Sequence, residues 1–166
     1  LARRFVYVSA YRLFVGTAAL RRVLAQLRGA STDFDVRLAD VTEAFAQISL
    51  MGARSADVAR AVGAEGLLEL SYFGVGEVVI AGIKAYAVRL SFVGEYGWEL
   101  TIPVEHAVAA YDALCTAGAQ PCGTLAQTSM RIEKQFLSYG HDLDTDMSPL
   151  HAGSALCVAG DTDCVG

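Results

Sequence analysis

The segment SFVGEYGWEL, residues 91–100, carries side chains that can bind a flat ring with N–H donors. In the strand that ends it, alternation places Trp98 and Leu100 on one face and Glu99 on the other. A carboxylate fixed beside aromatic surface can accept two parallel hydrogen bonds from adjacent N–H donors, such as those of an aminopyrimidine or pterin edge. Phe92, which we expect on the preceding strand, can supply the stacking face. The alternative is a β-hairpin with Glu99 solvated and Trp98 in the core.

The direction of Glu99 depends on the turn that precedes it. Gly94 and Gly97 bracket Glu95 and Tyr96. This pattern predicts a tight turn with positive φ at the glycines.

Arg131 is a second candidate. It lies in TLAQTSMRIEKQFLSYG, residues 124–140, which is predicted to form a helix. Arg131 is rotated by about 100° from Ile132 and therefore leaves the apolar stripe of this helix. Such an arginine is either a surface ion-pair partner or a ligand clamp. The predicted core-facing residues of the helix are Leu125, Ser129, Ile132 and Phe136.

No metal site is predicted. The three histidines, His106, His141 and His151, lack metal-site spacing, and neither a Gly-x-Ser-x-Gly motif nor a phosphate loop is present. The acidic segment HDLDTD lacks the glycine and the terminal glutamate of an EF-hand loop.

The elements that must hold these residues mix strands and helices without a regular βαβ rhythm, which predicts an α+β fold. Strands are expected at residues 4–9, as two short pieces within 35–52, and as a hairpin within 76–94 that turns at Ala81–Gly82. Helices are expected at 18–28 between Thr17 and Gly29, at 56–62 after an N-cap at Ser55, at 104–117 and at 124–140. In the helix that follows Pro103, the predicted core face is Val104, Val108, Tyr111, Leu114 and Cys115, and Gly118 ends it.

The composition restricts the class of protein. The chain has 166 residues, of which 54% are hydrophobic, and a net charge of −5 without a basic stripe. We therefore expect a globular protein that binds no nucleic acid. No apolar run approaches the roughly 20 residues that span a bilayer, so no membrane association is expected. The four cysteines, Cys115, Cys122, Cys157 and Cys164, are expected to be buried, reduced thiols in a reducing compartment.

Three spaced blocks of the sequence resemble the folate-binding aminomethyltransferase family, which includes the glycine-cleavage T-protein and the C-terminal folate region of dimethylglycine and sarcosine dehydrogenases. These blocks are DVTEAFAQISLMGARSADV (40–58), SFVGEYGWELTIPVEHAVAAYDAL (91–114) and SMRIEKQFLSYGHDLDTDMSPLHAG (129–153). The resemblance implies a T-protein-like folate-binding fold with ferredoxin-like pieces, and tetrahydrofolate as the one-carbon acceptor.

The resemblance also assigns roles to residues. In the family, a glutamate that binds the pterin ring follows an aromatic residue by seven positions, and these positions are Glu99 and Phe92 here. The family aromatic is usually tyrosine, so Phe92 keeps the stacking face and lacks the hydroxyl. Arg131 in SMRIE matches an arginine at the family's active site, and Tyr72 in SYF resembles an aromatic residue that lines the folate cavity.

The form GEYGWEL resembles the demethylating dehydrogenases more than the T-protein. This implies that an upstream domain uses FAD to oxidise an N-methyl amine, and that this region forms methylenetetrahydrofolate. The alternatives are a glycine-cleavage aminomethyltransferase, which takes an aminomethyl donor, and a non-catalytic binding or regulatory module of the same fold.

The chain is expected to be a fragment. Residues 1–39 match the tail of a ferredoxin-like subdomain, residues 40–166 match the second half of the folate-binding domain, and a further C-terminal β-domain is expected beyond it. The family's catalytic aspartate is expected upstream, so no catalytic residue is assigned to this chain and the fragment alone is expected to be inactive. The expected compartment is the cytoplasm, or the mitochondrial matrix for a eukaryotic relative. The oligomeric state is not predicted.

Overall fold

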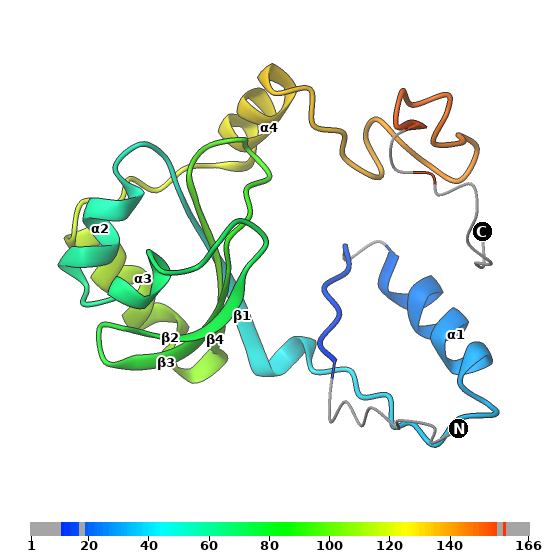
Figure 1. Cartoon of the computed structure of the whole chain (residues 1–166), viewed down its shortest axis with the longest axis horizontal. Coiled ribbons are helices and arrows are strands. Elements are labelled where there is room, and N and C mark those ends of the chain that lie inside the picture. The colour runs from blue at the N-terminus through cyan, green and yellow to red at the C-terminus, as the bar shows by residue number, and fades with distance from the viewer. Residues whose placement is uncertain (1–10, 17–18, 156–157, 159–166) are drawn as a thin grey trace, which may run out of the picture. The chain divides into compact units, whose positions relative to one another are not determined.

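Figure 1 shows the computed structural model of the chain, which describes residues 11–16, 19–155 and 158. Several expectations lie outside the described residues. These are the strand at residues 4–9, the Thr17 cap, and the burial of Cys157 and Cys164.

The chain forms two compact units. The first combines Leu1–Ala39 with Tyr139–Gly166, and the second is Asp40–Ser138. All four candidate site residues belong to the second unit.

The helix expected in the first unit is present as α1 (Leu20–Ala30). It continues through Gly29, which we expected to end it. Ser31 closes the helix instead, because its backbone N–H bonds the carbonyl four residues earlier at 3.0 Å. In the same unit, the guanidinium of Arg22 lies 5.5 Å from the ring centre of Tyr139.

The second unit is built on a four-stranded antiparallel sheet with the order β1-β4-β3-β2. Its strands are β1 (Phe45–Met51), β2 (Val75–Ile80), β3 (Ile83–Val88) and β4 (Gly97–Pro103). The hairpin expected around Ala81–Gly82 is confirmed as β2–β3. Both turn residues have positive φ, 48° at Ala81 and 81° at Gly82, which matches the twist of the two strands.

The prediction of two short strands within 35–52 is wrong, because only β1 is formed there. The Asp40 carboxylate accepts hydrogen bonds from the backbone N–H of Thr42 at 3.0 Å and from its hydroxyl at 2.6 Å. This local side-chain bonding starts the 3₁₀ turn Thr42–Ala44 that precedes β1, in place of a first strand.

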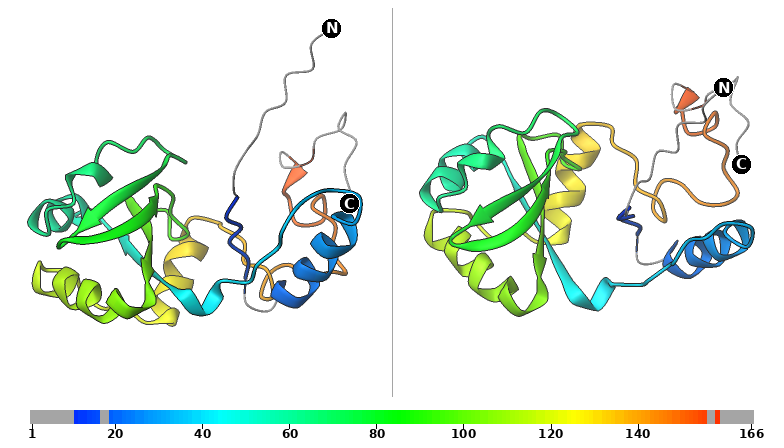
Figure 2. Two further views of the ribbon diagram at one scale, coloured as in Figure 1. Left: turned by 90° about the horizontal axis from the view of Figure 1, so that it is seen from below. Right: turned by 60° about the horizontal axis from the view of Figure 1, so that its bottom comes forward.

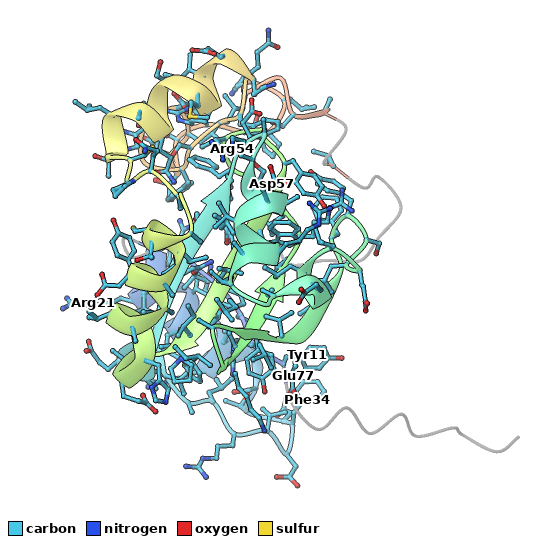
Figure 3. All side chains as sticks on the ribbon, turned by 90° about the vertical axis from the view of Figure 1, so that its left-hand side faces the viewer. Tyr11, Arg21, Phe34, Arg54, Asp57 and Glu77 are labelled. Carbon is cyan, nitrogen blue, oxygen red and sulfur yellow. The ribbon has the colours of Figure 1, made fainter. Side chains whose placement is uncertain are left out.

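Helices α2 (Ser55–Ala61) and α3 (Ala107–Thr116) pack against one face of the sheet, as Figures 1 and 2 show. On the outer side of α2, the Asp57 carboxylate lies 3.2 Å from Arg60, and Figure 3 shows Asp57 on this helix. One antiparallel sheet with packed helices confirms the α+β fold. The largest fully buried side chains of the core are Leu67, Ile80, Trp98, Leu100 and Ile102.

The core face predicted for α3 is wrong for most of its residues. Only Leu114 of the predicted set is buried, together with Ala110, whereas Val104, Val108 and Tyr111 are exposed. Alanines line the buried side of α3, so its backbone can lie close to the sheet. Gly118, with a φ of 104°, follows the helix end as expected.

The revised face of α3 gives a direct prediction. Leu114→Ala is expected to lower the free energy of unfolding by about 2–5 kcal/mol, because Leu114 is 2% exposed in the core. Val108→Ala is the matched control, because Val108 is 75% exposed, and its effect should stay within about 0.5 kcal/mol. Urea unfolding followed by circular dichroism measures both changes. Equal losses in the two variants would contradict this helix orientation.

The expectation for the cysteines holds only in part within the described residues. Both Cys115 and Cys122 are free thiols, but Cys115 is half-buried and Cys122 is exposed. Among the helices in the part of the chain that the structure describes, none is long and apolar enough to cross a bilayer.

Candidate functional site

Glu99 lies in the middle of β4, on the face opposite the core. Trp98 and Leu100 beside it are fully buried in the core, so the alternation predicted for this strand is confirmed. The Glu99 side chain is half-buried, and its Oε2 accepts a hydrogen bond from Nε2 of Gln47. Burial raises the pKa of the Glu99 carboxyl, and the hydrogen bond from Gln47 acts in the opposite direction.

The strand register explains why Gln47 reaches Glu99. Ser49 of β1 lies directly opposite Glu99, and Gln47 lies opposite Thr101, so Gln47 and Glu99 are diagonal neighbours on one face. Sequence reasoning missed Gln47. Alternation along β1 could have placed Gln47 and Ser49 on one face, but the pairing of β1 with β4 joins residues 52 positions apart.

Two glycines fix the loop that leads into β4. Gly94 has a φ of 74°, as expected, and a Cβ there would lie 2.3 Å from Cγ of Lys134. Gly97 does not have the positive φ that we expected. It is needed for another reason, because a Cβ on it would lie 2.1 Å from the backbone oxygen of Leu50.

Ser55 supports the same loop and does not act as the expected helix cap. The N-cap of α2 is Arg54, and the Ser55 hydroxyl donates to the carbonyl of Tyr96 at 3.0 Å. The backbone N–H of Gly52 donates to the same carbonyl at 2.8 Å. The start of β4 is therefore held by the segment that joins β1 to α2.

Arg89 ties the start of this loop to the turn that carries Tyr72. Its carbonyl accepts the N–H of Phe73 at 2.8 Å, and its own N–H donates to Gly74 at 2.9 Å. Its guanidinium donates to the carbonyl of Leu70 at 3.0 Å and lies 4.7 Å from the ring centre of Tyr96. Sequence reasoning missed Arg89, and no motif in the sequence marks it.

The two aromatic candidates lie on loops. Phe92 is half-buried in the bend between β3 and β4, so the expectation that it lies on a strand is wrong. Tyr72 is 60% exposed, and its ring centre lies 4.2 Å from that of Phe73 at a tilt of 52°. The turn that carries Tyr72 is held by the Arg89 connection.

Arg131 lies in α4 (Thr124–Glu133) and is only 4% exposed. Its Nη1 donates to the carbonyl of Phe136 at 2.9 Å, which holds the chain that leaves the helix. The core-facing set predicted for this helix is wrong: Leu125 is 86% exposed, and Ser129, Ile132 and Phe136 are also exposed. The arginine that was expected to leave the apolar stripe is instead the buried residue of α4.

The end of α4 meets the same loop as the other candidates. Nζ of Lys134 lies 3.7 Å from the Glu95 carboxylate, and its aliphatic stem packs against Gly94. The bend of Phe92, the turn of Tyr72, and the end of the Arg131 helix are thus each joined to the segment that leads into Glu99. Chemically, the structure offers a half-buried carboxylate that is oriented by an amide, and the loops joined to its strand carry aromatic rings.

Comparison with known proteins identifies relatives for most of the chain. The profile of the GCVT N-terminal domain family matches residues 6–162. The aminomethyltransferase of Exiguobacterium sibiricum is 32% identical over 148 residues, which are 89% of this chain and 41% of that protein. The aminomethyltransferase of Thermus thermophilus is 33% identical over 140 residues, 84% of this chain and 40% of that protein. That of Thermotoga petrophila is 27% identical over 158 residues, 93% of this chain and 43% of that protein. The chain thus spans about two fifths of the length of the curated relatives it matches.

Proposed function

Because the chain belongs to the family of the GCVT N-terminal domain, we propose that it is the folate-binding part of an enzyme that transfers one-carbon units to tetrahydrofolate. The relatives named above are aminomethyltransferases, which supports this class of reaction. The observation that carries the proposal is Glu99, a half-buried carboxylate oriented by Gln47 on the sheet face that α2 and α3 leave uncovered.

Glu99 is proposed to accept hydrogen bonds from the pterin ring. An ionised carboxylate is an acceptor only, and the pterin edge offers a ring N–H beside an exocyclic amine. The partial burial of Glu99 strengthens such hydrogen bonds, because fewer waters compete for the carboxylate. The donor set thus fits the ring.

The other candidate residues are proposed to shape the cavity. Phe92 and Tyr72 are proposed to contact the flat faces of the folate, as large aromatic side chains on adjoining loops. Arg131 is proposed to hold the end of α4 through its hydrogen bond to Phe136, which keeps Lys134 against the loop at Gly94.

The contribution of this chain to the reaction is positioning. Holding the acceptor amine of tetrahydrofolate near the donor carbon converts a bimolecular encounter into an oriented one. The catalytic aspartate of the family is proposed to lie in a preceding segment of the longer protein, so the chain alone is proposed to bind folate without turnover.

The motif GEYGWEL favours a demethylating dehydrogenase as the more specific function. The donor is then an N-methyl amine oxidised by an upstream FAD domain, rather than the aminomethyl donor of a glycine-cleavage enzyme. Trp98 of this motif is fully buried and packs edge-to-face on Tyr96 at 5.0 Å, so it acts on the core rather than on the Glu99 face. The motif therefore supports this choice through the resemblance alone.

A calorimetric titration of folinate into the 166-residue chain tests the proposal. We expect saturable binding of one folinate per chain once circular dichroism has established that the chain is folded. Calorimetry is preferable to tryptophan fluorescence, because Trp98 is buried on the opposite face of the sheet from Glu99. A folded chain that releases no binding heat at millimolar folinate would contradict a folate site in this chain and favour a non-catalytic module.

A further inference from the structure

The turn at residues 71–74 carries two exposed aromatic side chains on a strained backbone. The N–H of Gly74 donates to the carbonyl of Ser71 at 2.7 Å and closes the turn. Phe73 has a φ of 61°, in the left-handed region that bulky side chains rarely adopt. Its ring and that of Tyr72 are both largely exposed. A strained conformation persists only where the surrounding structure enforces it, so contacts from outside the turn must hold it.

Arg89 holds this turn with both its main chain and its side chain. Its carbonyl accepts the N–H of Phe73 at 2.8 Å, and its own N–H donates to the carbonyl of Gly74 at 2.9 Å. Its Nη1 donates to the carbonyl of Leu70, the residue before the turn, at 3.0 Å. The first two bonds do not use the side chain of Arg89, but the third depends on where the guanidinium lies.

The ring of Tyr96 fixes the position of that guanidinium. The guanidinium of Arg89 lies 4.7 Å from the ring centre. Within the part of the chain that the structure describes, no ion pair involves Arg89. A long charged side chain has many rotamers in water, and contact with a flat ring restricts them. Without this ring, the bond to Leu70 would have to order the whole side chain alone.

Tyr96 is itself fixed by the core and by its main chain. Its ring packs edge-to-face on the fully buried Trp98, with ring centres 5.0 Å apart and planes at 79°. Its carbonyl accepts the N–H of Gly52 at 2.8 Å and the hydroxyl of Ser55 at 3.0 Å. Contacts thus run without a break from Trp98 in the core, through Tyr96 and Arg89, to the strained turn.

We propose that Tyr96 is a positioning residue for folate binding. It fixes the Arg89 guanidinium, and through Arg89 it holds the turn in the conformation in which Tyr72 contacts the ligand. This inference rests on the proposed folate function, and it gives Tyr96 and Trp98 of the GEYGWEL motif a physical role although neither touches the ligand. A turn that is already ordered loses less conformational entropy on binding, which raises affinity.

Amide hydrogen exchange tests the hold on the turn without any ligand. Tyr96→Leu removes the ring, and exchange at the Phe73 N–H should become about tenfold faster or more, because the turn opens more often. Exchange at the N–H of Leu100, in the central strand β4, reports the stability of the sheet and should change by a clearly smaller factor. Tyr96→Phe keeps the ring and should exchange like the wild type. Equal factors at Phe73 and Leu100 in Tyr96→Leu would overturn the proposal.

Calorimetric titration of folinate tests the effect on binding. Tyr96→Leu should lower folinate affinity by about fivefold, roughly the effect of one partly desolvated cation–π contact, and Tyr96→Phe should restore it. In a chain that already carries Tyr72→Ala, Tyr96→Leu should lower affinity by no more than about twofold, because the ring that it positions is absent. Tyr111→Leu is the matched control on α3, since Tyr111 is 43% exposed and Tyr96 38%, and it should leave affinity within about twofold.

The outcomes separate this inference from the proposed function. A folded wild-type chain that binds no folinate contradicts the folate site, and exchange at Phe73 then still decides whether Tyr96 holds the turn. A Tyr96→Leu variant that weakens folinate binding by the same factor with and without Tyr72→Ala overturns the positioning role and leaves the folate site standing. Faster exchange at Phe73, together with a loss of affinity that requires Tyr72, supports the proposal.

Discussion

Glu99→Gln is expected to weaken folinate binding by about hundredfold or more, because hydrogen bonds to a charged acceptor are worth about 1.5–3 kcal/mol each and the two that Glu99 is proposed to accept from the ring are affected. The glutamine that replaces Glu99 keeps only one acceptor end. That single amide oxygen cannot accept both parallel hydrogen bonds from the ring, and the NH₂ end repels any ring N–H that it faces. Calorimetric titration of folinate into both proteins at neutral pH measures the ratio of dissociation constants.

The same substitution should not destabilise the fold. Burial raises the pKa of Glu99 in the folded chain, so the folded state binds the carboxyl proton more tightly than the unfolded state does. The stability linked to this proton is therefore present at acidic pH and is lost as pH rises through the raised pKa. At neutral pH the ionised Glu99 costs stability, and the neutral glutamine removes that cost. The difference in Tm between Glu99→Gln and the wild type should therefore shift in favour of the variant as pH rises from acidic to neutral.

Folinate binding itself should depend on pH in the opposite sense. It requires the ionised carboxylate, so wild-type affinity should fall as pH falls through the raised pKa of Glu99. Glu99→Gln has no carboxyl at this position and should lose that part of the profile. For a ligand-binding Glu99, the stability linked to its proton falls with rising pH while folinate affinity increases. A purely structural Glu99 would change stability with pH and leave folinate affinity unchanged.

Glu95→Gln is the matched control, because it changes the other carboxylate of the same ten-residue segment. Glu95 pairs with Lys134 at 3.7 Å on a partly exposed loop, and such pairs contribute about 0–1 kcal/mol. Its folinate affinity should stay within about twofold of the wild type. If Glu99→Gln also stays within twofold, Glu99 is a solvated strand residue and the proposed pterin contact is wrong.

Local patterns predicted the parts of this unit that depend on local physics. The Ala81–Gly82 turn could be predicted because β-branched residues flank a site that needs positive φ. The direction of Glu99 could be predicted because side chains alternate along any strand. The existence of α1, α2 and α3 followed from helical periodicity and from the glycines beyond two of them, Gly63 and Gly118.

Long-range packing decided what the patterns could not. On α3 the apolar stripe Val104–Val108–Tyr111 suggested a buried face. The side that carries the alanines is buried instead, because small side chains permit a closer approach to the sheet. On α4, the buried side chain is Arg131, and its Nη1 donates to the carbonyl of Phe136. The Gln47–Glu99 bond depends on which strands are neighbours, and no local pattern specifies that choice.

Gly97→Ala is expected to lower the free energy of unfolding by about 3 kcal/mol or more, because the new Cβ meets backbone rather than a side chain that can rotate away. A Cβ at Gly97 lies 2.1 Å from the Leu50 oxygen and 2.7 Å from the Met51 Cα. β4 must therefore move away from β1, and this movement strains the bonds that the Tyr96 carbonyl accepts. Because domain stabilities are about 5–15 kcal/mol, such a loss removes a large part of the total.

Gly66→Ala shows whether the cost is specific to this close approach. A Cβ at Gly66 lies 3.8 Å from Cγ1 of Val78, which is ordinary van der Waals contact, and the change should stay within about 0.5 kcal/mol. Urea unfolding followed by circular dichroism gives both values. Since β1 carries Gln47 and β4 carries Glu99, Gly97→Ala should also separate this pair and weaken folinate binding at temperatures where the variant is still folded. A Gly97→Ala variant as stable as Gly66→Ala would mean that the two strands do not lie as close as this register requires.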